Sequence, residues 1–174
     1  HRNNIHGIPE DCPARERYGW LGDANLVAEY SMWNFYGKTF WEKFLGDIET
    51  TRVLNNGIPA NIAPGKRGAR RDGNPDWTAS FIMLPWYLYE FYGDTAVLKQ
   101  YWDGMTHLMD HYAAIADRWI ISRGYGDYFD PGTDAIVSHT PVALTSSLWF
   151  YRCATVMSYA AKVLDLPDTA KTYK

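Results

Sequence analysis

NFYGKTFWEKF, residues 34–44, contains the end of one predicted helix and the start of the next. An aromatic pair and a glycine end the first helix, and Thr39 with Glu42 is typical of a capping box for the second. The same arrangement returns in EFYGDTAVLKQYW, residues 90–102, and more loosely in LDLPDTAKTYK, residues 164–174. Three joints of one kind predict three helical hairpins.

Helical periodicity covers most of the sequence between these joints. Asp23 is the expected N-cap of a first helix in which Leu26, Tyr30 and Trp33 recur on one face. Residues 77–92 are apolar almost all round, which predicts a helix buried on several sides.

Three further helices are predicted towards the C-terminus. Residues 97–119 carry the longest amphipathic face of the chain. Thr140 is the expected N-cap of a helix that starts at Pro141 and runs to about residue 164. A last helix is expected to start near Pro167.

Two long segments, 52–76 and 121–139, lack helical periodicity. Because they alternate with the tight joints, we expect the joints at one end of the hairpins and the long loops at the other. A ring of hairpins fits such uneven loops better than an open solenoid of regular repeats. The predicted fold class is therefore all-α, with functional residues on the face that carries the long loops.

Composition excludes several classes of function. The net charge is −3 without a basic stripe, so we expect no nucleic-acid partner. The apolar run 81–89 is too short to cross a bilayer, so we expect no membrane partner. Cys12 and Cys153 are too few for a disulfide framework or a zinc cage, although they could pair with each other. We expect no cofactor and no metal.

Carboxylates and aromatic rings gather in the segments expected on the long-loop face. Carboxylates suit sugar hydroxyls, and flat rings suit the apolar faces of sugars. Glycoside hydrolysis also needs a pair of carboxyls, one of them protonated. A structural ion-pair network is the alternative interpretation. The candidate site residues are Asp11, Arg15, Glu16, Trp20, Asp23, Trp77, Asp127 and Tyr128.

Three stretches resemble a known family. DCPARERYGWLGDA, residues 11–24, resembles the signature of bacterial α-L-rhamnosidases, glycoside hydrolase family 78, which reads roughly Asp-Cys-Pro-x-Arg-Glu-[Arg/Lys]-x-Gly-Trp-x-Gly-Asp. NPDWTASFIMLPWYLYEFYGD, residues 74–94, is similar to the family's Pro-x-Trp-Gly-Asp-Ala segment and the buried helix after it. GYGDYFDPG, residues 124–132, resembles its Gly-x-Gly-Asp-Trp loop, with Tyr128 in place of the tryptophan. Ala79 stands where the second segment usually has aspartate.

The resemblance implies an (α/α)6 toroid, of which this chain would form about half. Residues 1–22 would lead into the active site, and residues 23–174 would form about three hairpins. The implied reaction is inverting hydrolysis of terminal, non-reducing α-L-rhamnose in a rhamnoside or polysaccharide.

Motif positions imply roles for individual residues. Glu16 takes the place of the general acid. Asp11, Trp20 and Asp23 fall on positions that hold the rhamnose, and Trp77 falls on a second wall. Arg15, Asp127 and Tyr128 are further candidates for substrate binding.

The family's general base is a glutamate in the second half of the ring, so we expect it outside residues 1–174. The remainder of the catalytic domain, or a second copy of the chain, is then the expected partner. Alone, the half ring is expected to expose an apolar flank and to be inactive. An internal base, Asp127 or Asp130, is the alternative, at about 6.5–9.5 Å from the acid.

Two other functions stay open at this point. One is a carbohydrate-binding fragment without turnover, and the other is a related toroid glycosidase for another sugar. The compartment is open, with the periplasm or the extracellular space favoured over the cytoplasm.

Overall fold

The computed structural model describes residues 3–65, 73–127, 131–132 and 138–174. Within these ranges the chain contains helices and isolated β-bridges but no strand, which confirms the all-α prediction. The helices are α1 (Leu21–Asn34), α2 (Lys38–Leu54), α3 (Pro75–Thr78), α4 (Ser80–Tyr92), α5 (Thr95–Ile115), α6 (Val142–Val163) and α7 (Pro167–Thr172).

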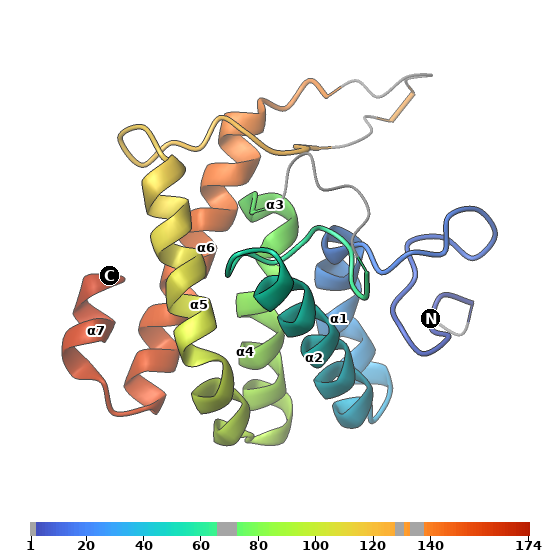
Figure 1. Ribbon diagram of the computed structural model, residues 1–174, viewed down its shortest axis with the longest axis horizontal. Helices are drawn as coiled ribbons and strands as arrows, with labels where there is room; N and C mark the ends of the chain where they lie inside the picture. The colour runs from blue at the N-terminus through green and yellow to red at the C-terminus, as the bar shows by residue number, and fades with distance from the viewer. Residues whose placement is uncertain (1–2, 66–72, 128–130, 133–137) are drawn as a thin grey trace.

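Three hairpins are stacked side by side (Figure 1). The α1–α2, α4–α5 and α6–α7 joints lie at the lower end of the view, and the long segments after α2 and α5 lie at the upper end. The predicted separation of tight joints and long loops is therefore confirmed.

Helix α4 is the centre of the packing. It contacts α1 and α6 on either side and also contacts α2 and α5. Its residues Ser80 to Leu88 are all buried, as expected for a helix that is apolar almost all round. Large side chains from the neighbouring helices complete the core, among them Trp41, Phe44, Leu45, Leu98, Met105, Tyr112, Val156 and Met157.

The predicted starts of two helices are wrong. Helix α1 has Trp20 at its N-cap, so Asp23 lies in its first turn. The reason is a tertiary contact, because the N–H of Leu21 is bonded to the carbonyl of Asn61 at 2.8 Å rather than to a side-chain cap. Helix α6 has Pro141 at its N-cap, so neither the Thr140 cap nor a first helical proline forms.

The predicted capping box at the first joint is also absent. Gly37 is the N-cap of α2, no side chain caps this helix, and Thr39 is exposed inside it. At the second joint the cap is Asp94, whose side chain accepts from the N–H groups of Ala96 and Val97 at 3.0 and 3.3 Å.

The bounds of two other predicted helices also differ from those in the structure. The helix predicted over 77–92 is divided into α3 and α4 at Ala79, and Pro85 lies inside α4. Helix α5 ends at Ile115, so Trp119 lies beyond it and is exposed.

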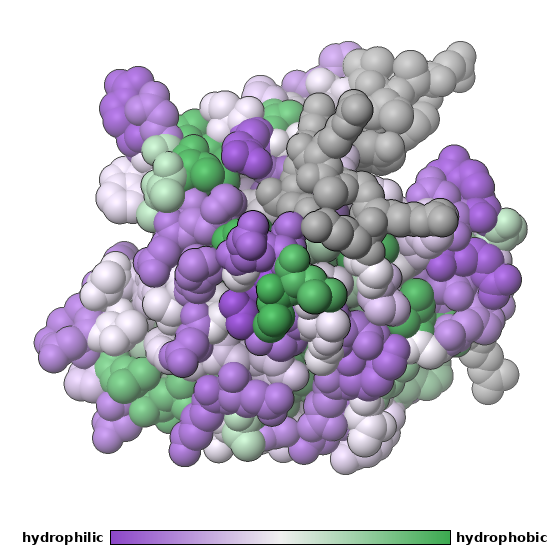
Figure 2. Space-filling view, viewed as in Figure 1, coloured by the Kyte–Doolittle hydropathy of each residue, from purple (hydrophilic) through white to green (hydrophobic). Residues whose placement is uncertain are grey.

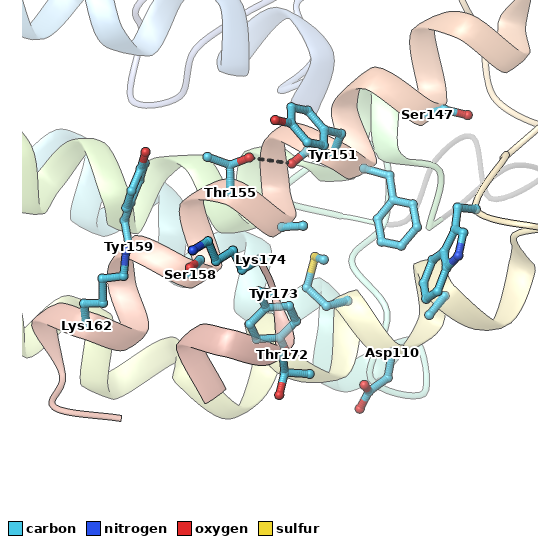
Figure 3. A pocket seen from close by; sticks show the side chains of 15 residues that line it. Asp110, Ser147, Tyr151, Thr155, Ser158, Tyr159, Lys162, Thr172, Tyr173 and Lys174 are labelled. Carbon is cyan, nitrogen blue, oxygen red and sulfur yellow. Dashed lines mark hydrogen bonds between the residues drawn. The ribbon is translucent and has the colours of Figure 1, made fainter. Parts of the chain in front are cut away.

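Apolar side chains remain exposed on the two outer members of the α1–α4–α6 row. On α1 they are Leu26, Tyr30 and Trp33, the residues whose spacing predicted the helix. On α6 they are Leu144, Leu148, Tyr151 and Tyr159, which follow one helix face. A groove of about 800 Å³ lies along α6, between α5 and α7, with Tyr159 and Tyr173 among its walls (Figure 3).

The surface turned to the viewer in Figure 2 is mostly hydrophilic, with apolar residues in scattered patches. No helix in the described ranges is long and apolar enough to cross a membrane. Both cysteines are free, so the disulfide left open by the sequence is not formed. Cys153 is buried, and burial raises the pKa of its thiol.

Asp94→Ala tests the cap at the second joint. The variant should lose about 1 kcal/mol of the free energy of unfolding, because α5 loses its side-chain cap. It also loses the ion pair between Lys38 and Asp94 at 2.9 Å. Thr39→Ala is the matched control and should change the free energy by less than about 0.5 kcal/mol. Urea denaturation of both variants makes the comparison, and equal losses would contradict the observed caps.

Candidate active site

The segment before α1 is fixed to the loop after α2 by backbone pairing. Trp20 and Ile62 form an antiparallel bridge. The N–H of Ala63 donates to the carbonyl of Gly19 at 3.0 Å, next to the bond from Leu21 described above. A Cβ at Gly19 would overlap the Ala63 carbonyl oxygen. Only glycine therefore permits this approach.

Residues 11–18 form a loop that Asp11 closes. Its N–H donates to the Tyr18 carbonyl at 2.9 Å, and its Oδ1 accepts from the Tyr18 N–H at 2.8 Å. The Cys12 thiol donates to Asp11 Oδ2 at 3.0 Å and accepts from the Glu16 N–H at 3.1 Å. Cys12 thus connects two candidate site residues. A carboxylate has about four lone-pair sites, so Asp11 keeps acceptor capacity for a ligand.

The Glu16 carboxyl is held against Trp20. Trp20 Nε1 donates to Glu16 Oε2 at 2.9 Å, and Arg15 Nη2 lies 3.1 Å from Oε1. The Glu16 side chain is 35% exposed, whereas Arg15 is 81% exposed. An ion pair this exposed adds little stability. The tryptophan is therefore the contact that fixes the carboxyl.

Asp23 brings a third carboxyl to the same place. Burial raises the pKa of Asp23, its own backbone N–H lowers it, and the negative charges of Asp11 and Glu16 raise it further. Asp11, Glu16 and Asp23 therefore form a carboxylate cluster at the N-terminus of α1. The like charges of Asp11 and Glu16 favour the protonated form of Asp23.

An aromatic wall stands beside the cluster. The Trp77 ring on α3 lies so close to Gly22 of α1 that a Cβ there would be 2.6 Å from Trp77 Cε2. The ring centroid of Tyr125 is 4.6 Å from that of Trp77, and Tyr125 meets Trp20 edge-on at 6.1 Å. Tyr125 was not predicted as a site residue. Its position between Gly124 and Gly126 is the signal that could have found it.

The remaining candidates are less well placed. Asp127 follows Gly126 on the same loop and is exposed. Tyr128 and Asp130 lie outside the described residues. In the parts of the chain that the structure covers, no three His, Cys, Asp or Glu side chains are grouped so that they could hold a metal ion.

The whole sequence, residues 1–174, matches the family described as the bacterial alpha-L-rhamnosidase 6 hairpin glycosidase domain. The chain belongs to this family. A curated alpha-L-rhamnosidase of Formosa agariphila is 34% identical over 175 residues, which cover 92% of this chain and 18% of that protein. The chain thus spans less than a fifth of this relative's length.

Solved structures agree with the family assignment. The alpha-L-rhamnosidase from Dictyoglumus thermophilum superposes with a TM-score of 0.90 at 35% identity, over 98% of this chain and 19% of that one. The Streptomyces avermitilis alpha-L-rhamnosidase complexed with L-rhamnose superposes with a TM-score of 0.87 at 26% identity, over 99% of this chain and 16% of that one. The hairpins therefore match part of the six-hairpin glycosidase fold, as predicted.

Gly22→Ala tests the contact between α1 and Trp77. The added methyl would displace the ring, and overpacking costs about 1–3 kcal/mol of the free energy of unfolding. Gly46→Ala is the matched control, because a Cβ at this helical glycine meets nothing within 4 Å. It should stabilise the chain by up to about 1 kcal/mol. Urea denaturation and the near-ultraviolet circular dichroism of the tryptophans report both effects, and an unchanged spectrum in Gly22→Ala would contradict the contact.

Asp23→Asn tests the raised pKa of Asp23 by the pH dependence of stability. The pKa of Asp23 is raised from 3.8 in the folded chain, so the folded state binds the proton more tightly than the unfolded state. Its stabilising contribution is complete below pH 3.8 and is lost as the pH rises through the folded pKa. Asparagine has no such loss. The free energy of unfolding of the variant, relative to the wild type, should therefore increase with pH across this window, and a constant or decreasing difference would contradict the raised pKa of Asp23.

Proposed function

We propose that the six-hairpin domain to which this chain belongs hydrolyses terminal, non-reducing α-L-rhamnose from rhamnosides. One observation carries the proposal. The Trp20 ring N–H fixes the Glu16 carboxyl in the carboxylate cluster with Asp11 and Asp23. Membership of the rhamnosidase family gives the sugar, and one structural relative is described as complexed with L-rhamnose.

Glu16 acts as the general acid in this proposal. Trp20 Nε1 occupies Oε2, so Oε1 is the oxygen that delivers the proton. The proton passes to the glycosidic oxygen as the bond from that oxygen to the anomeric carbon breaks. Water attacks the anomeric carbon from the opposite face and gives its proton to a base, so that the products are rhamnose and a free hydroxyl.

The other residues bind the sugar. Asp11 and Asp23 accept hydrogen bonds from its hydroxyls, and Trp77 and Tyr125 cover its apolar face. Asp127 lies at the edge of this site. The exposed guanidinium of Arg15 makes a polar contact at the rim.

We place the general base outside residues 1–174, in the remaining hairpins of the ring. The exposed apolar faces of α1 and α6 support this arrangement, because they lie on the two outer helices of the α1–α4–α6 row. Neighbouring hairpins on both sides would bury them, and burial of apolar surface contributes about 25 cal/mol per Å². The base then reaches the site from across the completed ring and leaves room for a water, as inversion requires.

Glu16→Gln tests the general acid, in a protein that carries this chain within a complete six-hairpin domain. Release of a poor leaving group from an alkyl α-L-rhamnoside should fall by about 10²–10⁴-fold, because the glycosidic oxygen receives no proton. Release of dinitrophenol from its rhamnoside should fall far less, because that leaving group needs no protonation. Hydrolysis rates of both substrates make the test.

Glu10→Gln is the control, since Glu10 lies in the same segment but pairs with His6 and Arg17 instead. It should leave both rates nearly unchanged. If the hydrolysis rates of both substrates fell equally in Glu16→Gln, or if neither rate fell, Glu16 would be excluded as the acid. Residues 1–174 alone should bind L-rhamnose in calorimetry without releasing it from a rhamnoside. Rapid turnover by this chain alone would place the base within it.

A further inference from the structure

One buried carboxylate holds the loop that carries Tyr125. Asp76 Oδ2 accepts hydrogen bonds from the N–H groups of Tyr125 at 2.5 Å and Gly126 at 2.8 Å. Asp76 precedes Trp77 on α3 and is buried, whereas Trp77 is only partly buried. A single helical turn therefore supplies both an aromatic wall of the site and the anchor of the facing loop.

The loop approaches this anchor so closely that Gly124 has no room for a side chain. Its φ is +148°, and a Cβ would overlap Asp76 Oδ2 and lie 2.6 Å from Ser146 Oγ. The preceding residue is fixed as well, because Arg123 Nε donates to Asn74 Oδ1 at 2.9 Å and its carbonyl accepts from Ser146 Oγ at 3.0 Å. The loop is thus attached to Asn74 and α6 before the tyrosine and to Asp76 of α3 after it.

Burying the Asp76 carboxylate costs free energy, and its hydrogen bonds to the loop offset part of this cost. Burial raises the pKa of Asp76, and the N–H groups of Gly126 and Tyr125 act against this shift because they stabilise the ionised carboxylate. Hydrogen bonds to an ionised acceptor are roughly twice as strong as neutral ones. Removing the carboxylate would leave two backbone donors unpaired and free the loop.

We propose that Asp76 is a positioning residue that holds the Tyr125 ring beside Trp77 and Trp20 as the third aromatic wall of the sugar site. This inference rests on the proposed function, because the occupant of the wall is a sugar. Asp76 lies behind the wall and acts through Tyr125 alone. Without the anchor the ring leaves Trp77, and the sugar loses one apolar contact.

A double-mutant cycle in L-rhamnose binding tests the proposal. Asp76→Ala and Tyr125→Leu should each weaken binding of L-rhamnose to residues 1–174 by about tenfold in calorimetry, the loss of one aromatic contact. The affinity of the double variant for L-rhamnose should equal that of the single variant with the lower affinity, because both changes remove the same contact. Tyr125→Phe should retain affinity. Additive losses, or full affinity in Asp76→Ala, would overturn the proposal.

Amide hydrogen exchange provides a measurement that does not depend on the sugar. In Asp76→Ala the amides of Tyr125 and Gly126 should exchange faster, while those of α4 keep their protection. Asp76→Asn should lie between the wild type and Asp76→Ala, since its amide oxygen still accepts, and it serves as the test if the alanine variant does not fold. Asp103→Ala, at an exposed position on α5, is the control.

The two ideas can fail separately. Failure of the wild type to bind L-rhamnose would refute the proposed function, and the exchange rates and the Trp77–Tyr125 signal in near-ultraviolet circular dichroism would still decide the role of Asp76. Unchanged exchange and an unchanged spectrum in Asp76→Ala would overturn that role.

Discussion

The site depends on the backbone pairing of residues 19–21 with residues 61–63. This pairing joins the segment before α1 to the loop after α2, and it forms only because position 19 has no side chain to meet the Ala63 carbonyl. It also satisfies the first N–H group of α1, which no side chain caps. Trp20 is thereby fixed in orientation, and Glu16 is fixed through the Trp20 ring N–H. Positioned donors and acceptors of this kind are what a catalytic site requires, because groups that are already oriented need no reorganisation during the reaction.

Two close contacts bring the rest of the site to this pairing. Trp77 lies directly on Gly22, and the loop with Tyr125 lies directly on Asp76. In both cases a glycine permits the approach, and the partner belongs to the short helix α3. This helix precedes the buried helix α4, so the aromatic wall is supported by the centre of the core. The carboxylate Asp76 stands one helical turn before Ala79, where related sequences were expected to carry an aspartate.

The sequence predicted the hairpins because their joints repeat and their helices keep a clear apolar period. It could group Asp11, Glu16, Trp20 and Asp23 as candidates because the residues of the leading segment are close in sequence. It failed where a distant partner decides the local structure. Leu21 bonds to Asn61 and thereby excludes Asp23 as a cap. Tyr125 was missed for the same reason, since its contact with Asp76 spans 49 residues. The exposed apolar period of α1 shows that periodicity identifies a helix but not its partner.

The most direct measurement of the central claim is a crystal structure of this chain with L-rhamnose. The account predicts a sugar whose apolar face lies on Trp77 and whose hydroxyls bond to Asp11 and Asp23. Its anomeric oxygen should point towards Glu16, which keeps its hydrogen bond to Trp20. A rhamnose bound elsewhere on the chain, or a Glu16 carboxyl that turns away from an occupied site, would contradict it.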